Sequence, residues 1–259
     1  MMREELIEQN EAAATLTSQD YWQTQWQGAE ARRGFELFDD VAKHLPRAPG
    51  LSFFEVGCAP GGILAEFCAR LGYEAHGIDY AADPSEIENF LRAEGVRTGR
   101  IHRADFLTWQ PERLYDVVAS FGFIEHFENA DEIADRHFQM ARPGGYVVIT
   151  MPNFARGQKL LHWLYDRENL RLHNTKIMNL KFLRRAAERN GARLVEARFA
   201  GGQYAFWVGG EHQLSWLPLR MMWRTDSLLQ RLKKSLPEGE NAWFSPYLMA
   251  VYQTKGASV

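Results

Sequence analysis

A short apolar run leads directly into a loop of small residues in the first quarter of the chain. Residues 53–62 read FFEVGCAPGG, and the segment ILAEF that follows has the apolar spacing of a helix. A strand, a tight turn and the beginning of a helix together form a nucleotide site, because glycines let the backbone approach a ligand and the first helical turn presents unpaired N–H groups. The sequence therefore predicts a nucleotide-type ligand at this loop.

A dinucleotide and S-adenosylmethionine are the two ligands to compare here. The loop has the G-x-A-x-x-G spacing of a dinucleotide site from Gly57 to Gly62, with Asp79 about 20 residues further on. Two residues argue against a ligand that contains a pyrophosphate. Glu55 puts a carboxylate at the end of the strand, and Pro60 removes an N–H donor from the loop. A carboxylate suits a ligand with a cationic amino-acid end, and S-adenosylmethionine carries both an ammonium and a sulfonium group.

The loop resembles the first motif of the class I S-adenosylmethionine-dependent methyltransferases, which runs acid-x-Gly-x-Gly-x-Gly. Here the motif consists of Glu55, Gly57, Ala59 and Gly61, with alanine in place of the second glycine. Segments similar to the family's later motifs follow in the expected order at 73–79, 101–106, 115–127 and 141–150. Several motifs in order are a specific signal, whereas any one of them alone is weak.

The resemblance implies S-adenosylmethionine as the cofactor and indicates the residues that bind it. Asp79 takes the position that binds the ribose hydroxyls in the family, and Asp105 the position that meets the adenine amino group. The predicted cofactor site consists of Glu55, Gly57, Cys58, Ala59, Gly61, Asp79, Tyr80, Asp105, Phe106 and Phe121. A small filler side chain is favoured over a reactive thiol at Cys58.

Strands and helices alternate from residue 51 to residue 151, which predicts a doubly wound α/β fold with helices on both faces of a parallel sheet. The resemblance implies seven strands, mostly parallel, with strand six at 193–199 and an antiparallel last strand at 247–254 forming the edge. Residues 49–259 are expected to form the methyltransferase domain, with insertions at about 153–177 and 209–243.

Residues 1–48 are expected to form three N-terminal helices. The first covers 3–14, the second begins after a cap at Thr17 or Ser18, and the third covers 29–45. Trp22 and Trp26 lie four residues apart in the middle helix, which puts two indoles on one face. The segment either packs on the core or folds over the cofactor cleft as a cap.

Methyl transfer is an in-line displacement, so the protein must first position the acceptor, and a base helps only if the acceptor is a hydroxyl. His126 is the candidate base, because it follows the fourth strand and imidazole exchanges a proton near neutral pH. The alternative is that it only shapes the pocket. Trp22, His162, His173 and Tyr204 are the candidate acceptor-binding residues. No metal cluster is visible in the sequence, although an ion held by residues distant in sequence stays open.

The net charge of −3 conceals ten basic against three acidic residues between Arg156 and Arg193. This segment forms either a solvated face or a contact with an acidic substrate or anionic surface. The second insertion contains a basic amphipathic pattern, for which burial, an apolar acceptor pocket and peripheral membrane contact are the alternatives. The charged start and the lack of any apolar run of about 20 residues predict a cytoplasmic protein. The two cysteines offer no disulfide framework.

The leading hypothesis is a methyltransferase acting on a small molecule, at oxygen, with an acidic or lipid-like acceptor. An RNA methyltransferase is the first alternative, and the slightly acidic chain disfavours nucleic acid. An NAD-dependent oxidoreductase and a binding protein without turnover are the others. The sequence predicts no oligomeric state.

Overall fold

The computed structural model describes residues 15–165, 167–202 and 239–256. The helix expected at 3–14, Tyr204 and most of the insertion expected at 209–243 lie outside these ranges. Within them, no helix combines the length and the apolar character that crossing a bilayer requires.

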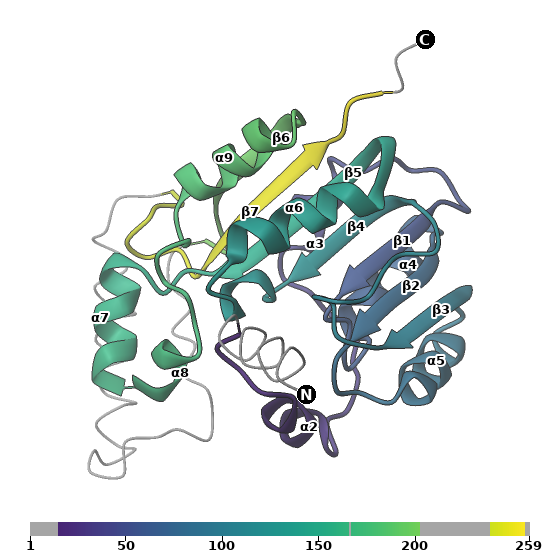
Figure 1. The fold of residues 1–259 in the computed structure, drawn as a ribbon, viewed down its shortest axis with the longest axis horizontal. Helices are drawn as coiled ribbons and strands as arrows, with labels where there is room; N and C mark the ends of the chain where they lie inside the picture. The colour runs from purple at the N-terminus through teal and green to yellow at the C-terminus, as the bar shows by residue number, and fades with distance from the viewer. Residues whose placement is uncertain (1–14, 166, 203–238, 257–259) are drawn as a thin grey trace, which may run out of the picture.

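Seven strands form one sheet in the order β3-β2-β1-β4-β5-β7-β6 (Figure 1). The strands are β1 (Ser52–Val56), β2 (Glu74–Asp79), β3 (Thr98–Arg103), β4 (Tyr115–Phe121), β5 (Ala141–Pro152), β6 (Arg193–Ala200) and β7 (Tyr247–Gln253). Strands β1 to β5 pair in parallel, and β7 pairs antiparallel with both β5 and β6. The predicted doubly wound fold with an antiparallel last strand is confirmed.

The expected position of the last strand at the edge of the sheet is wrong. β7 lies between β5 and β6, and β6 forms the edge. The residues of β7 from Leu248 to Tyr252 are all buried, whereas most of β6 is half-exposed. A continuous apolar run such as LMAVY is typical of a strand that is covered on both faces and paired on both sides.

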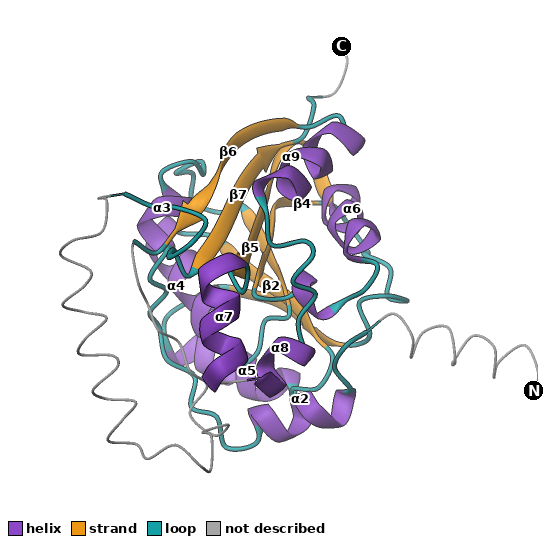
Figure 2. Cartoon of the chain, turned by 90° about the vertical axis from the view of Figure 1, so that its left-hand side faces the viewer, coloured by secondary structure: helices purple, strands orange, loops and turns teal. Residues whose placement is uncertain are grey.

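Helices cover both faces of the sheet, with α3, α4 and α5 on one face and α6 and α9 on the other (Figure 2). The helices of the described residues are α2 (Gln19–Trp26), α3 (Phe38–Ala42), α4 (Gly62–Leu71), α5 (Pro84–Ala93), α6 (Ala130–Met140), α7 (Arg156–Tyr165), α8 (Arg167–Arg171), α9 (Leu180–Arg189) and the 3₁₀ helix η1 (Ile124–His126). On the face that carries α3, α4 and α5, Phe53 of β1 stacks on Phe67 of α4 with ring centroids 5.3 Å apart. On the face that carries α6 and α9, Phe138 meets Tyr252 of β7 edge-on at 5.0 Å. Each face therefore has its own apolar core.

Local sequence signals set several of the helix boundaries. The Ser18 side chain accepts a hydrogen bond from Tyr21 N and caps α2, which confirms one of the two predicted caps. Pro84 occupies the first turn of α5, where its missing N–H costs nothing. The Asn179 side chain caps α9, and Gly191 follows that helix in the left-handed conformation.

The helix expected at 29–45 is wrong, since only α3 forms there. Gly34 has φ +137°, which interrupts a helix, and residues 29–35 carry no regular structure. This stretch runs across the first turn of α4: a Cβ placed on Gly62 would lie 2.1 Å from the carbonyl oxygen of Arg32. A tertiary contact between two backbones has overridden the helical spacing of the sequence.

Candidate active site

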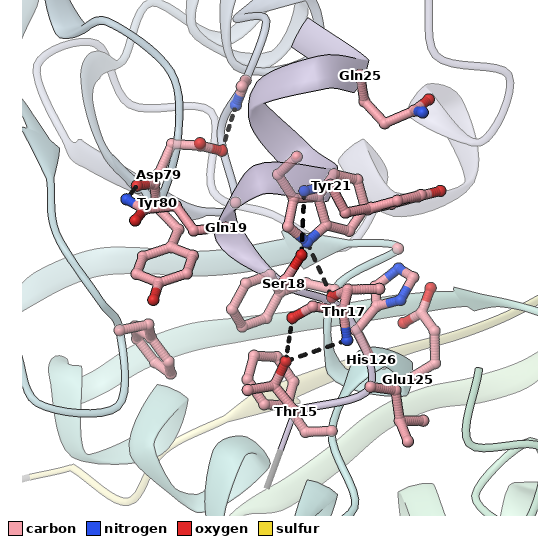
Figure 3. A pocket seen from close by; sticks show the side chains of 18 of the residues that line it. Thr15, Thr17, Ser18, Gln19, Tyr21, Gln25, Asp79, Tyr80, Glu125 and His126 are labelled. Atoms are coloured by element: carbon pink, nitrogen blue, oxygen red, sulfur yellow. Dashed lines mark hydrogen bonds between the residues drawn. The ribbon is translucent and has the colours of Figure 1, made fainter. Parts of the chain in front are cut away.

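A cavity of about 910 Å³ opens beyond the carboxyl ends of β1, β2 and β4. Figure 3 shows Asp79 and Tyr80 on one side of it and Glu125 and His126 on the other, with side chains of the segment 15–25 between them. That segment is bonded to both sides. Gln19 Nε2 donates to the carbonyl oxygen of Tyr80 at 2.8 Å, and the backbone N–H of Leu16 donates to that of His126 at 2.7 Å. Ligands of open α/β sheets bind at this end of the strands.

The loop between β1 and α4 forms one wall of the cavity. Gly57 has φ +72°, and a Cβ at this position would lie 2.7 Å from the ring of Phe123. Gly61, with φ +104°, precedes α4 and leaves the start of that helix without a side-chain cap. Backbone N–H groups at such a helix start are free to donate to a ligand.

Asp79 ends β2 and is fixed by three backbone donors. Its Oδ2 accepts from Ala59 N at 3.2 Å, and its Oδ1 accepts from Ala81 N at 2.9 Å and Ala82 N at 3.0 Å. A carboxylate has about four acceptor positions, so hydroxyl donors of a ligand can still bind to it. The next acid along the sheet, Asp105, accepts from Leu107 N at 2.8 Å in the turn after β3.

Glu55 lies behind the glycine loop and contributes no atom to the cavity wall. It is 3% exposed, and its Oε2 has no hydrogen-bond partner among the described residues. Burial, and to a smaller degree the nearby Asp79 carboxylate, raise the pKa of Glu55 well above its usual value. A buried acceptor without a donor is costly, and an ammonium group in the loop or an ordered water molecule would relieve that cost.

Glu125, His126 and His173 come together at the opposite side of the cavity, and we refer to them as the carboxylate–imidazole cluster. The two imidazole centroids lie 4.5 Å apart, and one ligand atom from each of the three residues lies within 4.8 Å of the others. His126 Nδ1 bonds to the carbonyl oxygen of Leu172 at 2.8 Å, and His173 Nδ1 to that of Asn169 at 2.6 Å. A carbonyl only accepts, so Nδ1 carries the hydrogen in both rings.

Burial determines the protonation of this cluster. Burial and the adjacent His173 lower the pKa of His126 to about 3, so its ring is neutral at neutral pH. Burial raises the pKa of Glu125 to about 8, and a backbone hydrogen bond opposes the rise. Its Oε2 has no hydrogen-bond partner in the part of the chain that the structure describes.

A family model described as "Methyltransferase domain" matches residues 29–197, more than half of the chain. The chain belongs to the class I S-adenosylmethionine-dependent methyltransferases. Its cofactor is S-adenosylmethionine. The cavity wall formed by the glycine loop, Asp79 and Asp105 contains small residues and acceptor oxygens. The family match decides against the oxidoreductase alternative.

Curated relatives match part of this methyltransferase. The ubiquinone biosynthesis O-methyltransferases of Shewanella sp. (strain ANA-3) and Chelativorans sp. (strain BNC1) are each 32% identical to this methyltransferase, over 40% and 44% of its length. These matches cover 44% and 48% of the relatives, so the shared region is about half of each of them.

Solved structures share the fold of this methyltransferase at low identity. Phosphoethanolamine N-methyltransferase 2 of Haemonchus contortus, in complex with S-adenosyl-L-methionine, superposes with a TM-score of 0.55 at 16% identity, covering 87% of this chain and 54% of that one. An S-adenosylmethionine-dependent methyltransferase from Mesorhizobium loti gives a TM-score of 0.53 at 16% identity, over 85% and 98% of the two chains.

Most of the residues predicted for the site of this methyltransferase line the cavity. They are Gly57, Ala59, Asp79, Tyr80, Asp105, Phe106 and Phe121 of the cofactor set, with His126, Trp22 and His173. Glu55, Cys58, Gly61 and His162 do not line it, and Tyr204 lies outside the described residues. Cys58 packs under the loop, where a Cβ on Gly77 would lie 2.7 Å from its sulfur, and burial raises the pKa of its thiol. The His162 ring packs on Phe154, with centroids 4.1 Å apart.

Sequence reasoning missed other residues of the wall. Thr15, Thr17 and Ser18 lie in the segment that enters the cavity ahead of α2, and Glu125, Phe123, Asn169 and Tyr247 complete the far side. Glu125 stands next to the predicted base and could have been found from that position. Asn169 and Tyr247 carry no local signal, because tertiary contacts alone bring them to the cavity.

Proposed function

We propose that this methyltransferase transfers a methyl group to an oxygen atom of a small, uncharged and largely apolar acceptor. One observation carries the proposal: the same cavity is lined by the cofactor-type loops on one side and by the carboxylate–imidazole cluster and aromatic rings on the other. S-adenosylmethionine supplies an electrophilic methyl group on a sulfonium when it is bound. The residues of the chain then have to bind the acceptor, orient its oxygen and exclude water.

Charge supports an uncharged acceptor. No lysine or arginine is among the described residues of the cavity lining, although its acids include Asp79, Asp105 and Glu125. A carboxylate or phosphate acceptor would enter without a cationic partner, at a high desolvation cost. The expected acidic acceptor and the RNA alternative therefore find no support in this lining.

Two of the basic residues between Arg156 and Arg193 form ion pairs away from the cavity. Arg189 bonds to Asp131 and Asp135, and Arg171 bonds to Glu168. This supports the interpretation of the segment as a solvated face rather than a substrate contact.

The acceptor side of the cavity is aromatic around the cluster. Trp22 meets the ring of His126 edge-on with centroids 5.0 Å apart and stacks on Trp26 at 5.6 Å. Phe123 and Phe127 line the same cavity. Such walls favour a planar or apolar body with a few polar atoms at one end. The O-methyltransferase names of the relatives support oxygen as the methylated atom.

We propose that His126 contacts the reacting hydroxyl. Its Nδ1–H is held by the Leu172 carbonyl, so Nε2 accepts a hydrogen bond from the acceptor and fixes the oxygen in place. A base whose pKa is about 3 is a weak proton acceptor, because general bases work best with a pKa near the operating pH. His126 therefore orients the hydroxyl more effectively than it deprotonates it.

An acceptor screen with labelled S-adenosylmethionine tests the proposal. The panel pairs uncharged phenols and catechols carrying apolar chains with their carboxylated analogues, and includes transfer RNA. We expect transfer to the uncharged hydroxyl compounds, and a loss of about 100-fold in kcat/KM for His126→Gln, as expected when the reacting atom is misplaced by about 1 Å. His102→Gln, a histidine of β3 outside the cavity, serves as the matched control. Transfer only to nitrogen, to anionic acceptors or to RNA would contradict the proposal.

A further inference from the structure

We propose that Glu125, His126 and His173 bind one divalent cation of the zinc class, and that the acceptor hydroxyl binds to this cation. The inference rests on the proposed function for the position of the acceptor. The existence of the cation site itself depends only on the three side chains.

The geometry of the cluster is that of a preformed set of ligands. One candidate ligand atom from each residue lies within 4.8 Å of the other two, so a single ion between them can reach all three. Zinc-to-ligand distances are about 2.0–2.2 Å for histidine nitrogen and carboxylate oxygen, so such atoms are separated by roughly 3–4 Å around a bound ion. Small rotations of the side chains close that difference.

Both imidazoles are oriented as metal ligands are. Each donates its Nδ1–H to a backbone carbonyl, of Leu172 for His126 and of Asn169 for His173, which leaves Nε2 as the ligand nitrogen. Metal-bound histidines almost always donate their second nitrogen in this way, because the bond fixes the tautomer and the direction of the ring.

The two carbonyls and the third ligand come from one short segment, residues 169–174, which is itself fastened to η1. Asn174 N donates to the carbonyl oxygen of Glu125 at 2.6 Å, and Asn174 Nδ2 donates to that of Phe127 at 3.0 Å. The insertion after β5 is therefore held in the position that completes the cluster.

A second observation points to a ligand independently of the distances. Glu125 is 1% exposed, lines the cavity, and its Oε2 has no hydrogen-bond partner among the described residues. No ion pair in the described ranges involves Glu125 either. A buried carboxyl oxygen without a partner is expensive unless something binds it, and a cation held jointly with the two imidazoles would do so.

The donor set indicates which ion fits. Two histidine nitrogens and one carboxylate are the ligand set of many catalytic zinc sites, whereas Mg²⁺ prefers oxygen ligands and keeps several waters. Three protein ligands leave a fourth position open. Because all three residues line the cavity, the acceptor oxygen can occupy that position.

Coordination would activate the acceptor hydroxyl directly. In this state Nε2 of His126 binds the ion, and the ion orients the hydroxyl in place of the hydrogen bond proposed above. A hydroxyl bound to Zn²⁺ loses its proton near neutral pH much more readily than a free one. The O–H bond breaks and the proton passes to water, while the electron pair stays on the oxygen. This pair forms the new oxygen–carbon bond as the sulfur–carbon bond of the methyl donor breaks, and the sulfonium becomes a neutral thioether.

Metal binding to the full chain tests this inference directly. The metal-free protein is titrated with Zn²⁺ by calorimetry and with Co²⁺ by visible absorption, with Mg²⁺ as a comparison. We expect about one equivalent of Zn²⁺ and a Co²⁺ spectrum with d–d bands of a four- or five-coordinate site. Glu125→Gln and His173→Gln, which keep the side-chain size, should each weaken Zn²⁺ binding by about 100-fold or more, since outer-shell changes alone cost 10–100-fold. His102→Gln should bind as the wild type does.

The outcomes separate the two proposals. S-adenosylmethionine binding and the thermal midpoint of each variant show that it has folded. No Zn²⁺ or Co²⁺ binding by the wild type, equal binding by His173→Gln, or preference for Mg²⁺ would overturn the cation site, and transfer to hydroxyl acceptors that survives chelation would leave the proposed function standing. Zn²⁺ binding lost in both variants, without transfer to any hydroxyl compound, would support the site and contradict the proposed function.

Discussion

The carboxylate of Asp79 accepts a hydrogen bond from the backbone N–H of Ala59, so the acid that ends β2 holds the loop that follows β1. The two residues are 20 positions apart in the chain, and their strands are neighbours in the sheet. The same carboxylate also fixes the turn at Ala81 and Ala82. One side chain thus positions two loops that line the cavity, the loop after β1 and the loop after β2.

We expect Asp79→Ala to weaken S-adenosylmethionine binding by about 1–3 kcal/mol, because the loop donors and the ribose hydroxyls lose a common acceptor. Isothermal calorimetry with the cofactor and its demethylated product measures the loss. Asp83→Ala is the matched control, since Asp83 caps α5 at the surface and is absent from the cavity lining. An equal loss in both variants would contradict the role given to Asp79.

Gly57→Ala should be more damaging than Gly95→Ala. Both glycines have φ near +70°, but a Cβ on Gly57 meets the Phe123 ring at 2.7 Å, whereas a Cβ on Gly95 meets nothing within 4 Å. The left-handed backbone alone costs about 1–2 kcal/mol for alanine. Urea unfolding should show about that loss for Gly95→Ala and a larger one for Gly57→Ala, together with weaker cofactor binding. Equal free energies of unfolding would show that the Phe123 ring moves aside without cost.

His137 should make the fold less stable in mild acid. Burial is the main cause that lowers its pKa to about 4 in the folded state, from 6.5 in the unfolded chain. As the pH falls below 6.5 the unfolded chain takes up the proton first, so folding stability drops until about pH 4, by about 3 kcal/mol in total and about 2 kcal/mol at pH 5. Urea unfolding at pH 7 and pH 5 should show a smaller decrease for His137→Met than for the wild type, by about 2 kcal/mol. A decrease in His137→Met as large as that of the wild type would contradict His137 as the cause of the lost stability.

Trp22→Ala should raise the KM for the acceptor by about tenfold with little change in the affinity for S-adenosylmethionine, since contact with an aromatic wall contributes about 1–3 kcal/mol. The indole contacts the His126 ring, and its Nε1–H is held by Thr17 Oγ1 at 2.9 Å. Trp163→Ala removes an indole that is 49% exposed on α7 and should leave both constants unchanged. A selective loss of cofactor affinity in Trp22→Ala would place the residue on the wrong side of the cavity.

The sheet and the loops at the carboxyl ends of its strands could be predicted because each of these parts has a local signal. Apolar runs in the sequence indicate β1 and β4, small residues follow β1, and Asp79 is the last residue of β2. The prediction of a helix over residues 29–37 failed because the structure there has no local signal. The contact between this stretch and Gly62 joins two backbones, and the side-chain pattern does not indicate it.

The carboxylate–imidazole cluster could be predicted only in part. His126 follows β4 and invited a functional interpretation, but nothing in the spacing connects it with His173, 47 residues later. Their contact depends on the path of the segment after β5 through α7 and α8 and on its bonds to η1. The sequence therefore indicated no metal site. That His126 and His173 lie side by side at the proposed cation site is visible only in the three-dimensional structure.

The strand order also bears on how the chain is completed during synthesis. Among the described strands β7 is synthesised after all the others, yet it lies between β5 and β6. Until Tyr247–Gln253 has emerged, β5 and β6 each lack the partner that pairs with them in this sheet. Exposed strand margins promote association between chains. A chain released before Tyr247 has been added is therefore expected to associate with other chains through the unpaired margins of β5 and β6.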